Sequence, residues 1–362
     1  MTRHRPRYTL TRTEDDHVWG VCQETEGLFG EPRRATYELF GWTPVPQRAR
    51  WLGSRIWLVP EDGGDDPWLL EDVEIVEARP SSAGDGTHDV VLVGHDDYLG
   101  PPRSFSGPVF LHDERERWGS GRGFTAVLPP ERTEHLPLRL LGCDPSPELR
   151  EALATGTRRS LDLGQAVLEI RDDEGVVLTE RYLRAGVTGW RPSALGRPGL
   201  VDVELDGDLL TPVPEYARPI WERWFAGPPP EAGAWAPYDT RHREVWLELV
   251  RERGCRQQPV DRPAGHTYEL DGRHVTDEPG LYCALGEAVN GPGGYFGSTL
   301  DGLDDCLRGG FGFTAPAVLV WRNSGAAHGS LVRQLRDDGE PYDLFAGVLD
   351  ILARRGVDVV LD

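Results

Sequence analysis

Residues 293–307 read Gly-Gly-Tyr-Phe-Gly-Ser-Thr-Leu-Asp-Gly-Leu-Asp-Asp-Cys-Leu, and this stretch says more about fold and function than any other. Two glycines, two aromatic residues and a third glycine lead into a pattern that predicts a short helix. Ser298 or Thr299 can cap its first turn, because a hydroxyl oxygen accepts a hydrogen bond from a free backbone N–H group. Asp301 follows Ser298 by three residues, which is the position of the acid in a capping box. The stretch therefore predicts a glycine-rich turn followed by a capped helix.

The two sides of this helix differ in chemistry. At about 100° per residue, apolar residues fall on one side and two acids on the other, with Asp304 at the margin. An acid in the first turn is also explained by the helix dipole, which contributes about 0.3–1 kcal/mol. Asp304 and Asp305 lie beyond the first turn, where the dipole no longer helps and like charges three or four residues apart destabilise the helix. The three acids therefore indicate either an external cationic partner or a face that is simply exposed to solvent. The apolar side is Leu300, Leu303, Cys306 and Leu307, and the acidic side is Asp301 and Asp305.

The Tyr-Phe-Gly turn and the Leu-Asp-Gly-Leu-Asp-Asp-Cys-Leu helix resemble the barstar family, intracellular protein inhibitors of secreted ribonucleases. The resemblance also covers Tyr268–Gly272, Ala317–Arg322 and the C-terminal strand. It implies a small three-stranded parallel sheet with helices. It further implies a basic ribonuclease as the protein partner, an immunity-type role that protects the producing cell, and a cytoplasmic location.

The same resemblance assigns roles within the stretch. In the family, the acid before the Cys-Leu pair enters the ribonuclease active site and stands in for the substrate phosphate; here that acid is Asp305. Asp301 matches a second acid that meets the basic cleft of the enzyme, and the preceding turn matches the recognition loop. The expected partner-binding residues are Tyr295, Phe296, Gly297, Asp301, Asp304 and Asp305.

Several positions depart from a well-studied member of this family. Asp304 stands where that inhibitor has tryptophan, and Arg308 where it has a small polar residue. Ile351 and Arg355, in the predicted last helix, align with two acids. The phosphate-mimicking core is kept while its surroundings are changed, so the identity of the target stays open.

The chain divides by composition into four segments. Residues 1–142 alternate short apolar runs with Gly, Pro and Asp clusters, and they predict a β-rich domain of unknown function. Residues 143–225 predict an α+β unit, either separate or part of the first domain. Residues 226–265 begin with a proline-rich run and predict a linker with one helix. Residues 266–362 predict the α/β barstar-like domain, in which the apolar run 317–321 is expected to be a strand buried on both faces.

Charge and cysteine content limit the partners and the compartment. The formal net charge is −21, and all 39 basic residues are arginine. Nucleic acid and anionic membranes attract basic surfaces, so we expect neither as a partner and expect a basic protein instead. No apolar run follows the charged N-terminal residues or approaches the roughly 20 residues of a membrane span, which favours the cytoplasm. The five scattered cysteines are expected to be reduced thiols.

No segment predicts an active site, and we expect no enzymatic activity, no cofactor and no metal. His88, His95, Asp96 and Asp97 are metal-ligand types, but the histidines lie seven residues apart across a predicted strand. Residues 119–123 are glycine-rich, yet they lack the lysine and following helix of a phosphate-binding loop, so we expect a plain loop. The alternative to an inhibitor is a barstar-fold interaction module with a non-nuclease partner, in which the N-terminal region carries the main function.

Overall fold

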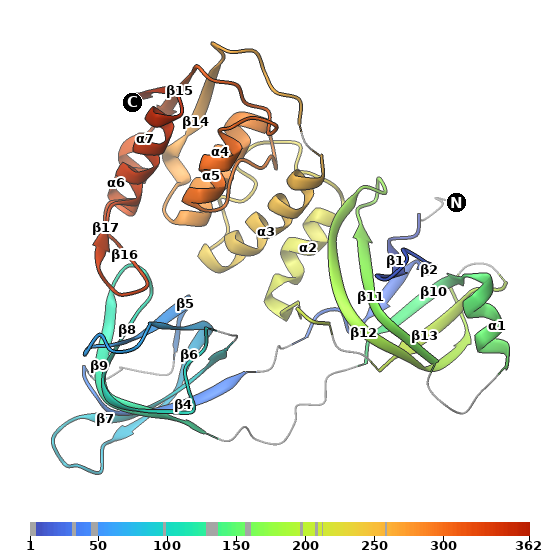
Figure 1. The fold of residues 1–362 in the computed structure, drawn as a ribbon, viewed down its shortest axis with the longest axis horizontal. Coiled ribbons are helices and arrows are strands. Elements are labelled where there is room, and N and C mark those ends of the chain that lie inside the picture. Colours follow the sequence, from blue (N-terminus) through green and yellow to red (C-terminus); the bar gives the residue numbers. More distant parts are fainter. Residues whose placement is uncertain are drawn as a thin grey trace.

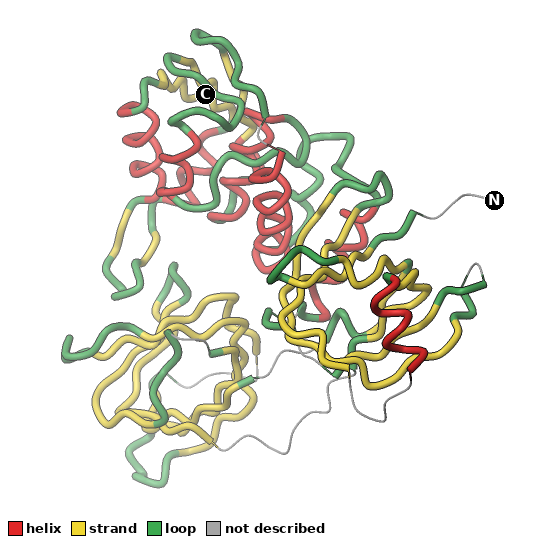
Figure 2. The backbone as a smooth tube through the Cα atoms, turned by 45° about the vertical axis from the view of Figure 1, so that its right-hand side comes forward, coloured by secondary structure: helices red, strands yellow, loops and turns green. Residues whose placement is uncertain are grey.

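The computed structural model describes residues 5–30, 34–44, 50–96, 99–127, 137–155, 161–195, 198–206, 209–211, 213–257 and 259–362. Figure 1 shows two β-rich units and an α/β unit at the C-terminal end, with helices α2 and α3 between them. In Figure 2 nearly all helices gather in the C-terminal half, while the strands of one β-rich unit close into a ring. The β-rich N-terminal region and the α/β C-terminal region agree with the predicted fold class.

The ring is a closed barrel in the order β4-β7-β6-β5-β8-β9. Its inner side chains, such as Leu39, Ile56 and Leu92, are fully buried. Residues 119–123 lie within strand β9, so the prediction of a plain loop was wrong. The glycines serve packing: a Cβ atom at Gly119 would lie 2.7 Å from the Trp42 ring. The strands are β4 (Ala35–Trp42), β5 (Arg50–Pro60), β6 (Trp68–Pro80), β7 (His88–His95), β8 (Ser104–His112) and β9 (Arg117–Val127).

The second β-rich unit is a seven-stranded sheet in the order β13-β12-β11-β1-β2-β10-β3. Its strands come from both sides of the barrel in sequence, so the barrel is inserted between β3 and β10. The boundary expected at residue 142 falls inside β10. The predicted hairpin around residues 172–174 is present as β11–β12. The elements are β1 (Tyr8–Arg12), β2 (Val18–Cys22), β3 (Glu24–Glu26), β10 (Arg139–Pro145), α1 (Pro147–Thr155), β11 (Leu161–Arg171), β12 (Val177–Pro192) and β13 (Val201–Leu205).

Two of the five cysteines are not free thiols, which corrects the expectation of reduced cysteines throughout. Cys22 of β2 and Cys143 of β10 form a disulfide across neighbouring strands. They are 121 residues apart in sequence, with the whole barrel between them, and the pairing of β2 with β10 brings them together. Cys255, Cys283 and Cys306 are free, and Cys283 and Cys306 are buried.

The segment predicted as a linker is packed against its neighbours along most of its length. It follows the short helix η1 (Glu215–Ala217) and helix α2 (Arg218–Phe225), and it contains α3 (Thr240–Gln257). Trp235 and Trp246 of this segment are buried in the same apolar cluster as helix α4. The buried Arg243 donates a hydrogen bond of 2.9 Å to Asp277, at the start of α4. Helix α3 is therefore part of the packing of the C-terminal unit.

The C-terminal unit contains the parallel sheet implied by the family resemblance, in the order β14-β15-β18. Strand β15 is less covered than predicted: Leu319 and Trp321 are buried, whereas Val318 and Val320 are only half-buried. Helix α6 and the β16–β17 hairpin were not predicted, because both are short and lack a strong apolar period. The elements are β14 (Thr267–Asp271), η2 (Gly272–His274), α4 (Glu278–Asn290), α5 (Leu300–Cys306), β15 (Ala317–Arg322), α6 (Ser324–Leu331), β16 (Gln334–Leu335), β17 (Pro341–Tyr342), α7 (Leu344–Arg354) and β18 (Val357–Leu361).

The barrel contacts the C-terminal unit and α3 at several places, and two of these contacts lie on different sides of the barrel. The β16–β17 hairpin reaches the barrel (Figure 1), where the Leu335 backbone N–H donates to the Glu114 carbonyl oxygen at 2.6 Å. On the other side, Arg241 of α3 donates to the buried carboxylate of Asp72 in β6 at 2.6 Å. These two contacts place the barrel beside α3 and the start of α4.

The packing of α3 on α4 leads to a stability prediction. We expect a fragment of residues 226–362 to be more stable than one of residues 266–362 by about 3 kcal/mol or more. The reason is that Trp246 and Val250 are buried in the same cluster as Leu281 and Leu285 of α4, and each large apolar side chain contributes about 1.5–3 kcal/mol when buried. Urea unfolding of the two fragments measures the difference, and equal unfolding free energies would show that α3 adds nothing to this unit.

Candidate protein-binding site

Helix α5 has the two faces expected from its sequence. Thr299 is its N-cap, and its hydroxyl oxygen accepts a hydrogen bond of 3.0 Å from the Gly302 N–H group. Leu303 is fully buried, and Cys306 and Leu307 are nearly so. Asp301 and Asp305 are exposed on the opposite side. The local periodicity thus places an acidic face on the surface, at the end of a glycine-rich turn.

Asp304 is engaged within the chain. Arg355, which follows α7, donates from Nε to Oδ1 of Asp304 at 2.7 Å, and Arg308 donates from Nη2 to Oδ2 at 2.8 Å. The hydrogen bonds from Arg355 and Arg308 hold the pKa of Asp304 well below its usual range. Asp304 therefore ties α5 to the end of α7, and its charge is neutralised locally.

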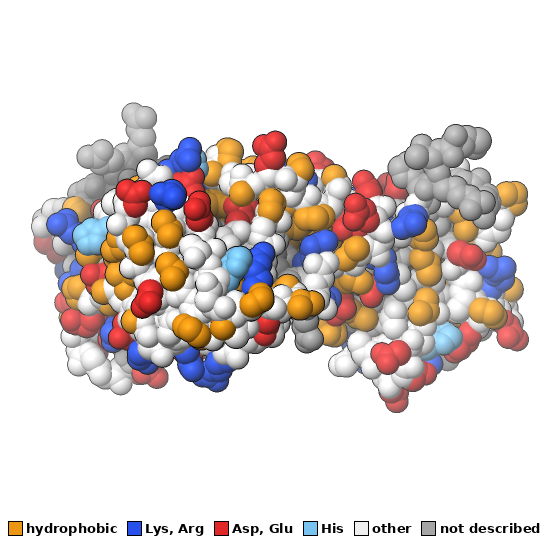
Figure 3. Space-filling model, turned by 90° about the horizontal axis from the view of Figure 1, so that it is seen from above, with side chains coloured by type: hydrophobic (Ala, Val, Ile, Leu, Met, Phe, Trp, Pro, Cys, Tyr) orange, Lys and Arg blue, Asp and Glu red, His pale blue; other side chains and the backbone are white. Residues whose placement is uncertain are grey.

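Asp305 is more available than Asp304. Its side chain is 67% exposed, and its contact with Arg308 is a single ion pair of 3.3 Å. An exposed pair of this kind contributes at most about 1 kcal/mol, so a partner can replace it at small cost. With Arg308 and Arg355 beside the three acids, the α5 face has only a small excess of negative charge. Over the face of the molecule that Figure 3 displays, acidic, basic and apolar side chains are interspersed.

The two aromatic side chains of the recognition loop, residues 293–299, are buried. Phe296 is 1% exposed and lies beside Phe313, and Tyr295 is 8% exposed. Gly297 has a φ of +92°, and a Cβ atom there would lie 2.8 Å from the Leu303 backbone, so only glycine fits. The structure thus brings the six expected residues together on one loop and helix, but of their side chains only Asp301 and Asp305 are on the surface.

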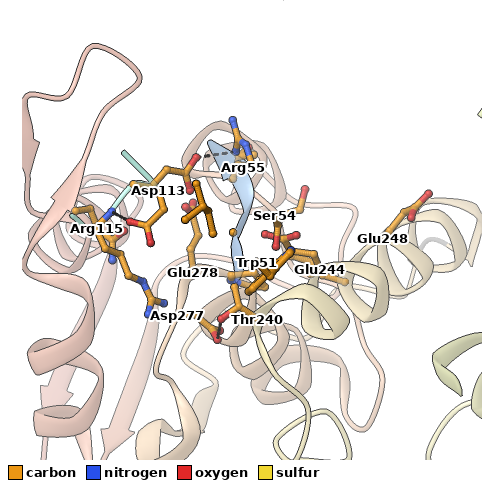
Figure 4. Close-up of a pocket in the computed structure, with 18 of the residues that line it drawn as sticks. Trp51, Ser54, Arg55, Asp113, Arg115, Thr240, Glu244, Glu248, Asp277 and Glu278 are labelled. Carbon is orange, nitrogen blue, oxygen red and sulfur yellow. Dashed lines mark hydrogen bonds and ion pairs between the residues drawn. The ribbon is translucent and has the colours of Figure 1, made fainter. Parts of the chain in front are cut away.

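A cavity of about 400 Å³ lies beside the N-terminus of α5 (Figure 4). Its walls come from the barrel, from one face of α3 and from the C-terminal unit. Sequence reasoning missed it, because these segments are far apart in the chain and none has a pattern of its own. The lining includes Trp51–Arg55, Asp113–Arg115, Thr240, Glu244, Leu247, Glu248, Arg251, Asp277–Pro279, Ser298, Thr299 and Gln334.

Two glutamates of this cavity hold their protons more tightly than exposed acids do. Burial raises the pKa of Glu244, which lies next to Ser54 (Figure 4), to about 8. Burial likewise raises the pKa of Glu278 to about 7, with the nearby Glu114 acting in the same direction. Among the described residues, no group of three or more His, Cys, Asp or Glu side chains is suited to hold a metal ion. His88 and His95 lie at the two ends of β7, and Asp97 lies outside the described residues.

These raised pKa values predict that the protein becomes less stable from pH 5 to pH 8. A glutamate in the unfolded chain titrates near pH 4.3, so between the two pKa values the folded state binds more protons than the unfolded state. Both side chains keep some contact with solvent, which screens the effect, so we expect Glu244 to account for a loss of only about 2 kcal/mol over this range. Glu244→Gln should flatten the decline, and Glu222→Gln, at an exposed position on α2, should not. Urea unfolding at several pH values measures the slope, and identical slopes in the two variants would contradict the assignment.

Comparison with known proteins bears on the C-terminal unit alone. Residues 265–358 match the family model described as Barstar (barnase inhibitor). No curated protein sequence was found to match the chain. None of the helices in the described ranges is both long enough and apolar enough to cross a membrane. The matched residues include β14, β15 and the start of β18, together with the recognition loop and α5. Residues 265–358 are therefore a barstar-family domain, and it stands at the C-terminal end of a chain whose two β-rich units lie outside the match.

Proposed function

We propose that this protein is an intracellular, non-enzymatic inhibitor of a basic ribonuclease, with Asp305 in the position of a substrate phosphate. The observation that carries the proposal is the exposed Asp305 carboxylate on α5 of a barstar-family domain. Its role is of the immunity type: it protects the cell that produces the enzyme.

The chemistry of a phosphate mimic explains the choice of Asp305. The active site of a ribonuclease holds cationic side chains that bind the phosphate of RNA. A carboxylate that enters this site exchanges its water for those cations, and such desolvated charge pairs hold a complex together. Asp305 meets the requirement because it is exposed and lightly paired, whereas Asp304 has two arginine partners.

A second candidate function is an interaction module with a non-nuclease partner. Two observations favour it: Arg308 and Arg355 neutralise Asp304, and the Tyr295 side chain is buried. Both reduce the surface that a strongly cationic cleft would recognise. The barrel and the seven-stranded sheet would then carry the main function.

Affinity capture separates the two candidates. The immobilised full chain is exposed to secreted proteins of the producing cell, in parallel with its Asp305→Ala variant. A basic ribonuclease held by the wild type and lost by the variant supports the inhibitor. Retention of a protein without ribonuclease activity, equally strong on both surfaces, supports the interaction module.

Asp304→Ala should act on association rather than on dissociation. Removing this carboxylate leaves Arg308 and Arg355 as unneutralised cations on the α5 face, and these repel a basic enzyme. We expect a slower association rate, by roughly threefold to tenfold at low ionic strength, and almost no change at high salt, where such charges are screened. Surface binding kinetics at two salt concentrations measure both rates. A change confined to dissociation would contradict this role.

A further inference from the structure

The last turn of α3 lies directly on the recognition loop. A Cβ atom at Gly254 would be 2.3 Å from the Cβ atom of Tyr295 and 3.1 Å from its Cγ atom, so the helix backbone touches this side chain. Burial raises the pKa of the Tyr295 hydroxyl. Helix α3 precedes the family match, which begins at residue 265. A segment outside the barstar-family domain therefore covers the loop of that domain.

The attachment of α3 weakens toward this end. Its first half is held by the buried pair Arg243–Asp277, at 2.9 Å, and its later turns by the buried Arg181, which contacts Glu248 at 2.8 Å and Glu252 at 3.0 Å. The last residues, Cys255–Gln257, are exposed. Within this end, glycine at position 254 lowers helix stability by roughly 1 kcal/mol relative to alanine.

The main tie between the last turn and the rest of the molecule runs through Arg256. This side chain pairs with Glu180 of β12 at 3.3 Å and donates to the Glu252 carbonyl oxygen at 2.8 Å. Both Arg256 and Glu180 are about one-third exposed, so the pair is weak. The last turn can therefore separate from the loop while the rest of α3 stays in place.

We propose that the last turn of α3, residues 254–257, is an autoinhibitory cover of the recognition loop, residues 293–299, and that the partner docks after this turn moves off Tyr295. The proposal rests on the proposed function, since it describes how binding at the same loop is controlled. A cover that is closed for nine-tenths of the time lowers the apparent affinity about tenfold without changing any contact of the bound complex.

Two variants open the cover by different routes. Gly254→Ala places a methyl group where Tyr295 already lies, so the turn must move away. Arg256→Glu replaces the tie to Glu180 with a repulsion and introduces no steric clash. Gly329→Ala is the matched control, because Gly329 is in helix α6 and a Cβ atom there meets nothing within 4 Å.

The test measures amide hydrogen exchange at residues 293–299 of the full chain, together with binding kinetics to purified barnase. We expect faster exchange and at least a tenfold higher association rate in Gly254→Ala and Arg256→Glu, with dissociation and the Gly329→Ala control unchanged. Faster amide exchange combined with an equal or slower association rate would show that α3 stabilises the loop in its binding conformation. That result would contradict an autoinhibitory cover. Unchanged exchange in both opening variants overturns it as well. If neither the wild type nor any variant binds barnase, the proposed function fails for this enzyme, and the exchange rates at residues 293–299 alone decide the cover. If all bind at the wild-type rate, the proposed function stands and the cover is overturned.

Discussion

Asp305→Ala is expected to weaken the complex with the target ribonuclease by about 2–5 kcal/mol, mainly through faster dissociation. Truncation leaves cations of the enzyme buried without a partner, and their desolvation is then uncompensated. The fold of the domain should not change, because Asp305 is exposed and lies opposite the buried residues Leu303 and Leu307. Binding kinetics give the rates, and circular dichroism checks the fold.

The chain offers a matched control for this substitution. Asp15 is also an exposed acid that pairs with an arginine three residues away, but it lies in the N-terminal sheet unit. Asp15→Ala makes the same change in net charge and should leave dissociation unaffected. Equal dissociation rates for Asp305→Ala and the wild type would show that Asp305 does not enter the active site of the enzyme.

Asp277→Ala should produce the largest loss of stability, about 3–5 kcal/mol. The buried carboxylate caps α4 by accepting from the Gly280 N–H group at 2.8 Å, and it also pairs with the buried Arg243 at 2.9 Å. Removing one partner of a buried ion pair leaves the other charge without compensation. Urea unfolding followed by tryptophan fluorescence measures the effect, since Trp235 and Trp246 lie in the same cluster.

Asp343→Ala measures the contribution of helix capping alone, without that of a buried ion pair. Asp343 caps α7 in the same way, accepting from the Ala346 N–H group at 2.8 Å, but it lies in an exposed setting. Its loss should cost about 0.5–2 kcal/mol, the usual value of an N-cap. If both variants lost the same stability, the Arg243–Asp277 pair would contribute nothing beyond capping.

The features that sequence predicted well are local ones. Helix α5 follows from a cap and a period of 3.6 residues, and both lie within residues 298–307. The three parallel strands of the C-terminal unit follow from apolar runs that alternate with helices. The barrel insertion could not be predicted in this way, because the pairing of β1 with β11 joins strands that are more than 150 residues apart. Strand β9 was missed because its glycines have no apolar period, although the Trp42 ring requires them.

In the candidate site, too, local features could be predicted from the sequence and long-range contacts could not. Exposure of Asp301 and Asp305 follows from the helix period alone. The pairing of Asp304 with Arg355 depends on how α5 packs against α7, and the burial of Tyr295 depends on α3, which is outside the barstar-like stretch. The sequence pattern identifies which residues form the loop and helix, but charge and access there are decided by segments distant in the chain.

The central claim is that the exposed acids of α5 inhibit a basic ribonuclease. The most direct test is RNA cleavage by the secreted basic ribonuclease of the producing cell, measured with increasing amounts of the full chain and of its Asp305→Ala variant. We expect the wild type to stop cleavage at an equimolar ratio, and the inhibition constant of the variant to be at least about thirtyfold higher, which corresponds to the lower limit of the expected loss of binding energy. Full cleavage in the presence of excess folded wild-type protein would contradict the claim.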